Sequence, residues 1–484
     1  MGSYLQHYIG GQWIDSEGGT SHDVVNPATE EVVSTVTLGT AADVEKAVKA
    51  ARKAFDSFSE SSKADRVALL ERVVAEYKKR IPDIARAISE EMGAPISIAL
   101  TAQSGSGLGH LMSTIEALKG FDFEESTGKN KVVYESIGVV ALITPWNWPM
   151  NQIVAKVAPA IAAGNAVILK PSEQTPGSAA IFAEVMHAAG VPAGIFNLVQ
   201  GDGPGVGTAL AQHPDVDMIS FTGSTRAGIM VAKNAADTVK RVHQELGGKS
   251  PNIILPGTPL DMALPGGAGG VLLNSGQSCV APTRLLVHTS QYEEAIEKLA
   301  AIFGGKAVDD PAKEGDHIGP VVNKAQYDKI QGLIQKGIDE GARVAVGGTG
   351  RPAGKEKGYY VQPTVFRDVS NDMTIAREEI FGPVLVVIPY DTLDEAVEIA
   401  NDTPYGLGAY IAGDPAVAKT IVRRIRAGSV FVNAGGLDFN SPFGGYKQSG
   451  NGREFGKFGL EEFLETKSVI GDLPADAPPA EVAG

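Results

Sequence analysis

Val139-Val-Ala-Leu-Ile-Thr144 is the stretch that decides the fold, because it is a short and uninterrupted apolar run. Such a run is typical of a strand that is buried on both faces. Similar runs recur at Ala166–Leu169, Ile195–Val199 and Met218–Phe221, with segments of helical spacing between them. Strands that alternate with helices predict a parallel sheet. We therefore expect a doubly wound α/β domain, a common location for dinucleotide sites.

Further elements are predicted on both sides of this series. Upstream, short strands and turns are expected over Tyr8–Trp13 and Val24–Pro27, and apolar periodicity predicts helices over Ala41–Phe58, Lys63–Met92 and Thr101–Leu118. Downstream, a second α/β domain is predicted from the apolar runs Asn252–Leu255, Arg284–His288, Arg343–Val346, Val384–Ile388 and Ser429–Val432. The end of the chain, 475–484, is rich in Pro, Ala and acidic residues, which predicts a disordered tail.

The composition excludes several functional classes. The chain has 484 residues, of which 43% are hydrophobic and 20% charged, as expected for a globular protein of two or three domains. Its net charge of −15 argues against a nucleic-acid binder, which usually carries a basic surface. No signal peptide and no apolar run of membrane-spanning length is visible. We therefore expect a cytoplasmic protein.

Three polar turns could hold a dinucleotide. Gly223-Ser-Thr-Arg-Ala-Gly228 lies between a predicted strand and a helix and differs by one residue from the G-x-G-x-x-G pattern. Gly201–Gly207 is a second glycine-rich turn of the same kind. Lys170-Pro-Ser-Glu173 closes another strand, where a carboxylate can bind ribose hydroxyls. Taken singly, each is equally compatible with an ordinary loop.

Cys279, the one cysteine, lies in Gly276-Gln-Ser-Cys279. It cannot form an intrachain disulfide, and a thiolate is a strong nucleophile that forms acyl intermediates. Glu245, placed after a predicted helix, is a candidate base, and Asn147, between two prolines, is a candidate oxyanion donor. A buried apolar cysteine, a carboxylate at a helix end and a turn-forming asparagine remain alternative interpretations, because spacing alone does not bring the three together.

Seven segments in a fixed order give a more specific signal, because together they resemble the aldehyde dehydrogenase superfamily. The resemblance extends from Tyr8 to Val469. Its motifs are Pro145-Trp-Asn-Trp-Pro149, Lys170-Pro-Ser-Glu173, Phe221-Thr-Gly-Ser224, Glu245-Leu-Gly-Gly248, Gly276-Gln-Ser-Cys279, Glu378-Glu-Ile-Phe-Gly-Pro383 and Ser441-Pro-Phe-Gly-Gly445.

The resemblance implies a fold and a reaction. It implies a Rossmann-type cofactor domain (1–118 and 137–247), a catalytic domain (248–455) and a β oligomerisation arm (119–136 and 456–474). It implies oxidation of an aldehyde to a carboxylate with NAD or NADP. Cys279 would be the nucleophile, Glu245 the base that activates water, and Asn147 one half of the oxyanion hole, with no metal required.

By the same resemblance the cofactor contacts are assigned, and Glu173 predicts a preference for NAD because a carboxylate repels a 2′-phosphate. The matching positions are Thr144, Trp146, Lys170, Ser172, Glu173, Gly203, Gly207, Phe221, Thr222, Gly223, Ser224, Thr225, Gly228, Leu246, Gly247, Glu379 and Phe381. Lys131–Tyr134 and Glu465–Ile470 match strands that pair with another subunit, so a homodimer or homotetramer is expected.

The substrate pocket is predicted from motif positions. Ala155 stands where several relatives of the family carry a Trp, or an Arg that pairs with a semialdehyde carboxylate. With Ala434-Gly-Gly-Leu437 opposite and the glycines at 105, 107 and 109 near the mouth, we expect a wide tunnel that prefers bulky aromatic or long-chain aldehydes. The predicted lining is Trp148, Asn151, Gln152, Ala155, Ser278, Val280, Leu437 and Phe443.

Several alternatives remain open. The chain could be a semialdehyde dehydrogenase of a catabolic pathway. It could pass the acyl group to coenzyme A, although that branch of the superfamily generally lacks a base like Glu245. A catalytically silent binding protein is disfavoured by the intact Cys279, Glu245 and Asn147 set, and a plain thiol hydrolase would leave the glycine-rich turns unexplained.

Overall fold

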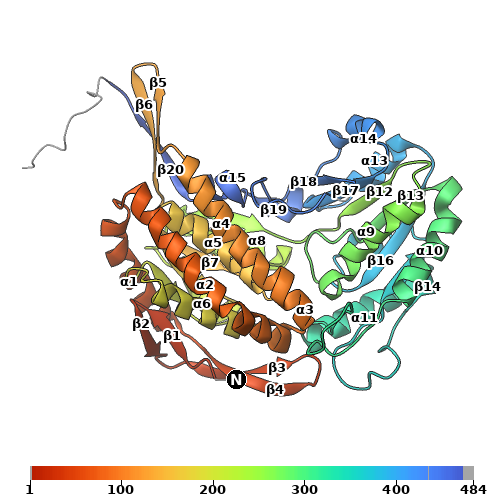
Figure 1. Ribbon diagram of the computed structural model, residues 1–484, viewed down its shortest axis with the longest axis horizontal. Helices are drawn as coiled ribbons and strands as arrows, with labels where there is room; N and C mark the ends of the chain where they lie inside the picture. Colours follow the sequence, from red (N-terminus) through yellow and green to blue (C-terminus); the bar gives the residue numbers. More distant parts are fainter. Residues whose placement is uncertain (1–2, 434, 472–484) are drawn as a thin grey trace, which may run out of the picture.

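The first of two large sheets matches the predicted doubly wound domain. The structure is a computed structural model that describes residues 3–433 and 435–471. This sheet has the order β19-β11-β10-β7-β8-β9-β1-β2, in which β11 to β9 run parallel. The last two strands of this order, β1 and β2, lie near the N-terminus (Figure 1). Its strands are β1 (Gln6–Ile9), β2 (Gln12–Asp15), β7 (Val139–Ile143), β8 (Ala166–Lys170), β9 (Phe196–Leu198), β10 (Met218–Thr222), β11 (Arg241–Glu245) and β19 (Gly450–Asn451).

The order of these strands creates a natural binding edge. The chain runs outward from β7 through β8 to β9, then returns to the other side of β7 to form β10 and β11. The carboxyl ends of β7 and β10 therefore border a topological switch point, where open α/β sheets bind their ligands. The helices of this lobe are α1 (Ala41–Phe58), α2 (Lys63–Met92), α4 (Ser104–Gly120), α5 (Pro149–Ala162), α6 (Pro176–Ala188), α7 (Thr208–Gln212) and α8 (Thr225–Ala235).

The second large sheet has the order β14-β15-β16-β13-β12-β17-β18, with β14 alone antiparallel. Both of its faces are buried, because Leu285 and Val287 of β13 join one hydrophobic cluster while Leu286 between them joins another. Its strands are β12 (Pro251–Ile254), β13 (Arg284–His288), β14 (Arg343–Val346), β15 (Thr364–Arg367), β16 (Val384–Tyr390), β17 (Gly408–Ala412) and β18 (Ser429–Val432). Its helices are α9 (Leu260–Leu272), α10 (Tyr292–Gly304), α11 (Lys324–Asp339), α12 (Thr374–Arg377), α13 (Leu393–Asn401) and α14 (Pro415–Val422).

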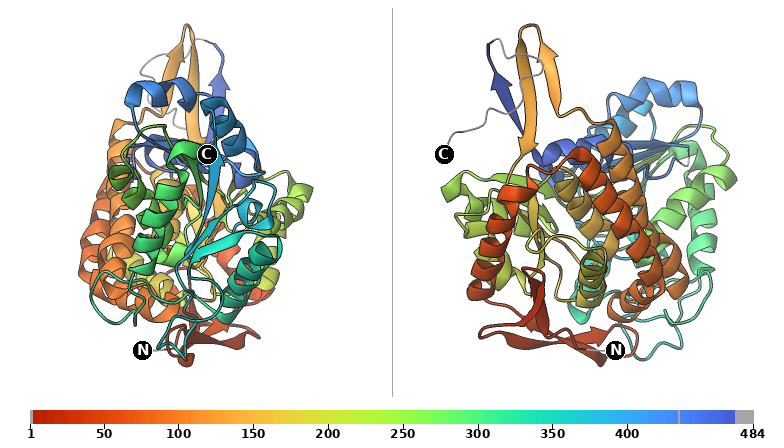
Figure 2. Two further views of the ribbon diagram at one scale, coloured as in Figure 1. Left: turned by 90° about the vertical axis from the view of Figure 1, so that its right-hand side faces the viewer. Right: turned by 60° about the vertical axis from the view of Figure 1, so that its left-hand side comes forward.

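A third sheet projects from the body as an arm. It consists of β5 (Glu124–Thr127), β6 (Asn130–Ser136) and β20 (Leu464–Val469) in the order β20-β6-β5. Figure 2 shows this arm at the end of the molecule opposite the N-terminal strands β1 to β4. The other small sheet pairs β3 (Thr20–Asn26) with β4 (Glu31–Leu38), and α15 (Gly456–Glu462) precedes the last arm strand. The predicted tail, 475–484, lies outside the described residues.

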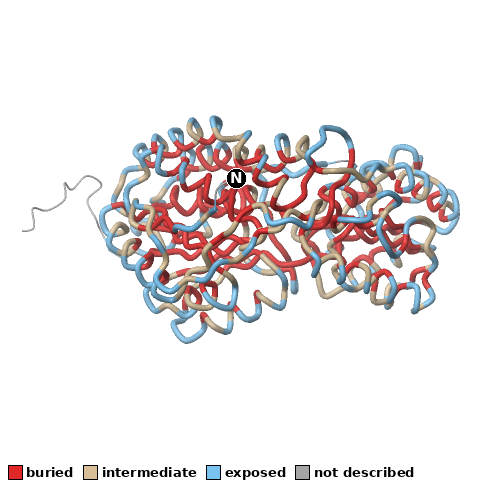
Figure 3. The backbone as a smooth tube through the Cα atoms, turned by 90° about the horizontal axis from the view of Figure 1, so that it is seen from below, coloured by how far each residue is buried: buried red, intermediate tan, exposed pale blue. Residues whose placement is uncertain are grey.

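The buried chain is concentrated inside the two lobes, and the exposed chain runs around them (Figure 3). The helices predicted over Ala41–Phe58 and Lys63–Met92 are confirmed with those bounds. The helix predicted over Thr101–Leu118 is also present, but it opens with a π-turn at Ala99–Gln103. No helix in the described part of the chain is long and apolar enough to cross a membrane.

Candidate active site

Cys279 lies where two cavities meet. One cavity, of about 140 Å³, borders the carboxyl ends of β7, β10 and β11, and we call it the strand-end cavity. The other, of about 510 Å³, lies on the far side of the cysteine, and we call it the apolar cavity. Cys279 and Gln152 line both. A group held in either cavity can therefore reach the same sulfur atom.

A strained turn presents the cysteine. Asn274, Ser275 and Gly276 all have positive φ angles, of 54°, 55° and 78°, which two non-glycine residues adopt only when their surroundings hold them. The Ser275 hydroxyl donates to Gly319 O at 2.7 Å, and the Gln277 side-chain oxygen accepts from the Val322 N–H at 2.9 Å. These contacts fix the loop that ends at Cys279.

Asn147 is held against the same loop. Its Nδ2 donates to Gln277 O at 3.1 Å, which leaves the second N–H of the amide available. The backbone carbonyl of Asn147 accepts from Asn274 Nδ2 at 2.9 Å and from Gln103 Nε2 at 3.1 Å. The next residue, Trp148, donates from Nε1 to Ser278 Oγ at 2.8 Å. The side chain of Asn147, the predicted oxyanion donor, is therefore bonded to a residue that lies two positions before Cys279, the predicted nucleophile.

Glu245 occupies an unusual position for a carboxylate. It ends strand β11, not a helix as the sequence suggested, and only 2% of its surface is exposed. Neither carboxylate oxygen has a hydrogen-bond partner among the described residues. Burial raises the pKa of Glu245 well above its ordinary value, and nearby Glu454 adds to that effect while Lys156 opposes it.

The thiol shares this electrostatic environment. Burial raises the pKa of Cys279 above its ordinary value, and the carboxylates of Glu379 and Glu245 raise it further. Cys279 and Glu245 are therefore both biased toward their protonated forms in the protein alone. Glu245 therefore acts on the thiol through its charge, although it lines neither cavity.

The strand-end cavity is built largely by predicted cofactor residues. Ser224 caps helix α8, where its Oγ accepts from the Ala227 N–H at 3.3 Å. Glu379 accepts from the Gly248 N–H at 2.9 Å, and Phe381, at φ 64°, packs edge-on against Trp146. The predicted residues that line this cavity are Trp146, Thr222, Gly223, Ser224, Leu246, Gly247, Glu379 and Phe381.

The other predicted cofactor residues do not line this cavity. Lys170 is buried at the end of β8, donates to Gly201 O at 2.6 Å and lies 3.6 Å from Glu173. Gly207 faces the stem of Lys170, which joins the second glycine-rich turn to this group. Thr144 and Thr222 carry buried hydroxyls without a partner among the described residues. The remaining residues that do not line the cavity are Ser172, Gly203, Phe221, Thr225 and Gly228. Among them, Phe221 is buried in the core and Gly228 faces Leu246.

The apolar cavity contains every predicted substrate residue except Ala155. The prediction for Ala155 is wrong, because this residue is 3% exposed and packs with Leu407, Phe443 and Phe455 behind the cavity wall. Of the three glycines predicted near the mouth of the tunnel, only Gly105 lines this cavity. Gly107 faces Tyr77, and Gly109 faces Phe439. Ala434 lies outside the described residues. Sequence reasoning missed Thr101, Ala102, Leu273, Tyr410, Phe431, Phe439 and Phe455.

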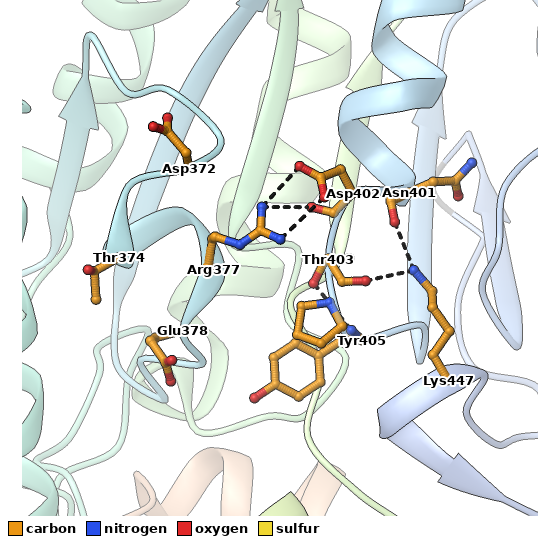
Figure 4. Close-up of a pocket in the computed structure, with 10 residues that line it drawn as sticks. Asp372, Thr374, Arg377, Glu378, Asn401, Asp402, Thr403, Tyr405 and Lys447 are labelled. Atoms are coloured by element: carbon orange, nitrogen blue, oxygen red, sulfur yellow. Dashed lines mark hydrogen bonds and ion pairs between the residues drawn. The ribbon is translucent and has the colours of Figure 1, made fainter.

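A further cavity, of about 620 Å³, lies away from the cysteine beside α12 and the end of α13 (Figure 4). Its cations are already paired: Arg377 binds Asp402, and Lys447 donates to the carbonyls of Asn401 and Thr403 at 2.8 Å. No cysteine is among the described residues that line it, so the junction at Cys279 is the better candidate site.

Comparison with known proteins agrees with this geometry. The model of the "Aldehyde dehydrogenase family" matches residues 13–469. A "3-succinoylsemialdehyde-pyridine dehydrogenase" from a Pseudomonas species is 52% identical over 97% of this chain and 99% of its own. A crystal structure of a mutant aldehyde dehydrogenase C from Pseudomonas syringae with NAD+ and octanal is 51% identical, covers 98% of both chains and has a TM-score of 0.96. An aldehyde dehydrogenase from Bartonella henselae is 49% identical, covers 97% of this chain and 99% of its own and has a TM-score of 0.95. With the sequence matched over nearly its whole length and the fold shared throughout, the chain belongs to the aldehyde dehydrogenase family.

Proposed function

We propose that this protein oxidises a bulky or long-chain aldehyde to its carboxylate, with Cys279 as nucleophile, Glu245 as base and Asn147 as oxyanion donor. The observation that carries the proposal is that Cys279 lines both the strand-end cavity and the apolar cavity. A hydride acceptor and an aldehyde can then approach one sulfur atom from two sides.

The residues around the strand-end cavity fit a dinucleotide. The capped N-terminus of α8 at the switch point suits a pyrophosphate, and the buried, unpartnered hydroxyls of Thr144 and Thr222 lack an acceptor or donor that a ligand can supply. Lys170 and Glu173 suit an adenosine ribose, and Glu379 and Phe381 suit the nicotinamide ribose. Solved relatives carry NAD+, so NAD is the cofactor proposed here, with NADP as the weaker choice. When bound, it supplies the acceptor for the hydride.

The chain's own residues perform the remaining steps. The Cys279 thiolate forms a bond to the aldehyde carbon, and the electron pair of the broken C=O π bond moves to the oxygen, which becomes an alkoxide. The free N–H of Asn147 and the backbone N–H of Cys279 stabilise that charge, an effect of about 3 kcal/mol per donor. Loss of the hydride leaves a thioester. Glu245 then takes a proton from water, whose oxygen attacks the thioester carbon, releasing the carboxylic acid and the thiolate.

The lining of the apolar cavity supports a large, uncharged substrate. It carries the rings of Trp148, Tyr410, Phe431, Phe439, Phe443 and Phe455 and no charged side chain among its described lining residues. Burial of apolar surface contributes roughly 25 cal/mol per Å², so substrates that fill the cavity should bind best. The relatives fit this range, since one is named for a pyridine-bearing semialdehyde and another was crystallised with octanal. A semialdehyde dehydrogenase is the second candidate, favoured by the first of these names.

A panel of aldehydes tests the proposal. Octanal and benzaldehyde should give higher kcat/KM than acetaldehyde and succinic semialdehyde, with NAD preferred to NADP and no dependence on coenzyme A. Acetaldehyde or succinic semialdehyde as the best substrate would contradict the substrate class. NADH formation that requires coenzyme A would contradict hydrolysis by Glu245.

Assembly is proposed from the arm. The strand β20 pairs with β6 along one edge only, and an exposed edge strand invites pairing with another chain. We expect a homodimer or a dimer of dimers through this sheet. A monomer in small-angle scattering at working concentration would contradict it.

A further inference from the structure

Strand β11 carries a second polar residue beside Glu245. His243 lies two residues earlier, so both side chains point to the same face of the sheet. The neighbouring strand places Ser220 opposite His243, and its Oγ lies 2.9 Å from His243 Nδ1. His243 is 1% exposed and Ser220 is fully buried. Nothing in the proposed mechanism uses either residue.

Two sets of unpaired atoms face each other at this point. His243 Nε2 has no hydrogen-bond partner among the described residues, and neither has any oxygen of the Glu245 carboxylate. His243 Nε2 lies 3.8 Å from Glu245 Oε1, just beyond hydrogen-bond length. Buried polar atoms without partners are costly, and a small rotation of the carboxylate would satisfy both.

We infer that His243 is a positioning residue that donates a hydrogen bond from Nε2 to the Glu245 carboxylate and so favours the ionised form of the proposed base. The inference rests on the proposed role of Glu245 in hydrolysis. Ser220 takes part by donating its Oγ–H to Nδ1, which fixes the imidazole tautomer with the proton on Nε2.

The charges around this pair favour a neutral donor. Lys156 of α5 forms a buried ion pair with Glu454, and Arg453 and Glu462 also face the carboxylate. Burial lowers the pKa of His243 well below its ordinary value, and Lys156 and Arg453 lower it further, so the imidazole stays neutral. A neutral imidazole donates one hydrogen bond without adding a charge. It stabilises the ionised carboxylate where burial and Glu454 oppose it.

The test is the pH dependence of steady-state kcat in the full-length enzyme with NAD and octanal. In His243→Leu the midpoint of the rising limb should move up by about one pH unit, which lowers kcat about tenfold at pH values below it. KM for octanal and the first-turnover NADH burst should stay unchanged, because His243 lines neither cavity. His243→Gln, whose amide can donate from a similar position, should restore the wild-type midpoint. Ser220→Ala should shift it in the same direction by less.

His7→Leu is a matched control. His7 is also fully buried, and its Nε2 also lacks a partner while lying 3.5 Å from a carboxylate, that of Asp43. It belongs to β1, which four strands separate from β11. An unmoved midpoint in His243→Leu, or an equal shift in His7→Leu, overturns the inference. If His243→Leu does not fold, an unmoved midpoint in Ser220→Ala overturns it. If Glu245→Gln retained normal hydrolysis, the proposed base itself would be refuted, and this result distinguishes the two failures.

Discussion

The two cavities that meet at Cys279 are built in different ways. The strand-end cavity takes most of its walls from the turns that follow β7, β10 and β11, where neighbouring parallel strands end together. Residues of the second lobe complete it, namely Cys279, Gln326, Lys329, Glu379 and Phe381. The apolar cavity takes its walls from α4, α5, α9, β17, β18 and the loop at 435–443, which are distant in sequence. The first cavity is therefore built mainly at the strand ends of one sheet, whereas the second is built from side chains of many separate elements.

This difference separates chemistry from specificity. Backbone groups at strand ends keep their positions when side chains change, so the strand-end cavity suits a ligand that many enzymes share. Side chains from several elements can each change without disturbing the sheet, so the apolar cavity suits a ligand that differs between enzymes. Substitutions at the junction should therefore affect every substrate, and substitutions in the apolar cavity should affect only some.

The largest effect is expected at the junction. Cys279→Ala removes the proposed nucleophile, so turnover of every aldehyde should be lost while the fold is retained. NADH formation, thermal unfolding and NAD binding are the measurements. As the one cysteine in the chain, Cys279 should also take up all thiol-directed label. Residual turnover above roughly 1% of wild type would exclude the thioester mechanism, since a covalent step cannot be replaced by general acid–base catalysis alone.

Glu245→Gln should separate the two halves of the reaction. The amide fills the same space but cannot accept a proton from water, so steady-state turnover should fall by roughly 10²- to 10⁴-fold. The first-turnover NADH burst should remain, because it precedes hydrolysis. Stopped-flow measurement gives both quantities in one experiment. An equal loss of burst and steady state would assign Glu245 to activation of the thiol.

The pH dependence should follow from the raised pKa values at the junction. Cys279 and Glu245 both act in their deprotonated forms, and burial raises the pKa of each. Turnover should therefore rise with pH above neutrality, by up to tenfold per unit below the controlling pKa. Steady-state rates from pH 6 to 9.5, with thermal unfolding measured at each pH, would show it. A rate that is flat or falling above pH 7 is the contrary result.

Sequence reasoning missed more of the lining of the apolar cavity than of the strand-end cavity, although seven of the eight predicted substrate residues do line the apolar one. Eight predicted cofactor residues line the strand-end cavity, and six of them lie in short motifs at the ends of β7, β10 and β11. Ala155 failed because small size was equated with open space, whereas Phe443 and Phe455 fill that space from elsewhere in the chain. No local pattern indicates a contact between residues almost 300 positions apart.

The fold shows the same limit. Periodicity over 18 and 30 residues located α1 and α2 with their observed ends. It missed β11, whose sequence Arg-Val-His-Gln-Glu is polar for a central strand, although three of its five residues are buried. Two of those buried polar side chains meet other polar groups, since His243 contacts Ser220 and Gln244 donates to Gly228 O. The division into domains at 247 and 455 remains a prediction.

Filling the apolar cavity should change specificity and leave the junction intact. Gly105 lines this cavity, and a Cβ built on it would have no atom within 4 Å, so Gly105→Leu should occupy free space. We expect kcat/KM for octanal to fall about tenfold relative to that for acetaldehyde, which corresponds to roughly 1.4 kcal/mol. Gly120→Ala, at the other end of α4 and equally uncrowded, is the control for the helix. Equal losses for both aldehydes would mean that the cavity does not hold the substrate chain.

The smallest effect is expected at the far end of the dinucleotide site. Glu173 is 28% exposed in its side chain and lies 3.6 Å from Lys170, whose ammonium also donates to Gly201 O. Glu173 thus pairs with the Lys170 ammonium, and its carboxylate would repel a 2′-phosphate. For both reasons we expect NAD to be preferred. Glu173→Gln removes the repulsion and frees Lys170 to meet the phosphate, a change of about 1 kcal/mol for partly exposed charges. The ratio of kcat/KM for NADP to that for NAD should rise about fivefold, with the aldehyde preference unchanged. Glu297→Gln, at an exposed position of α10, should leave the ratio as it is. An unaltered ratio in Glu173→Gln would mean that cofactor choice is set elsewhere in the proposed dinucleotide site, and that the comparison between the two cavities does not extend to the adenosine end.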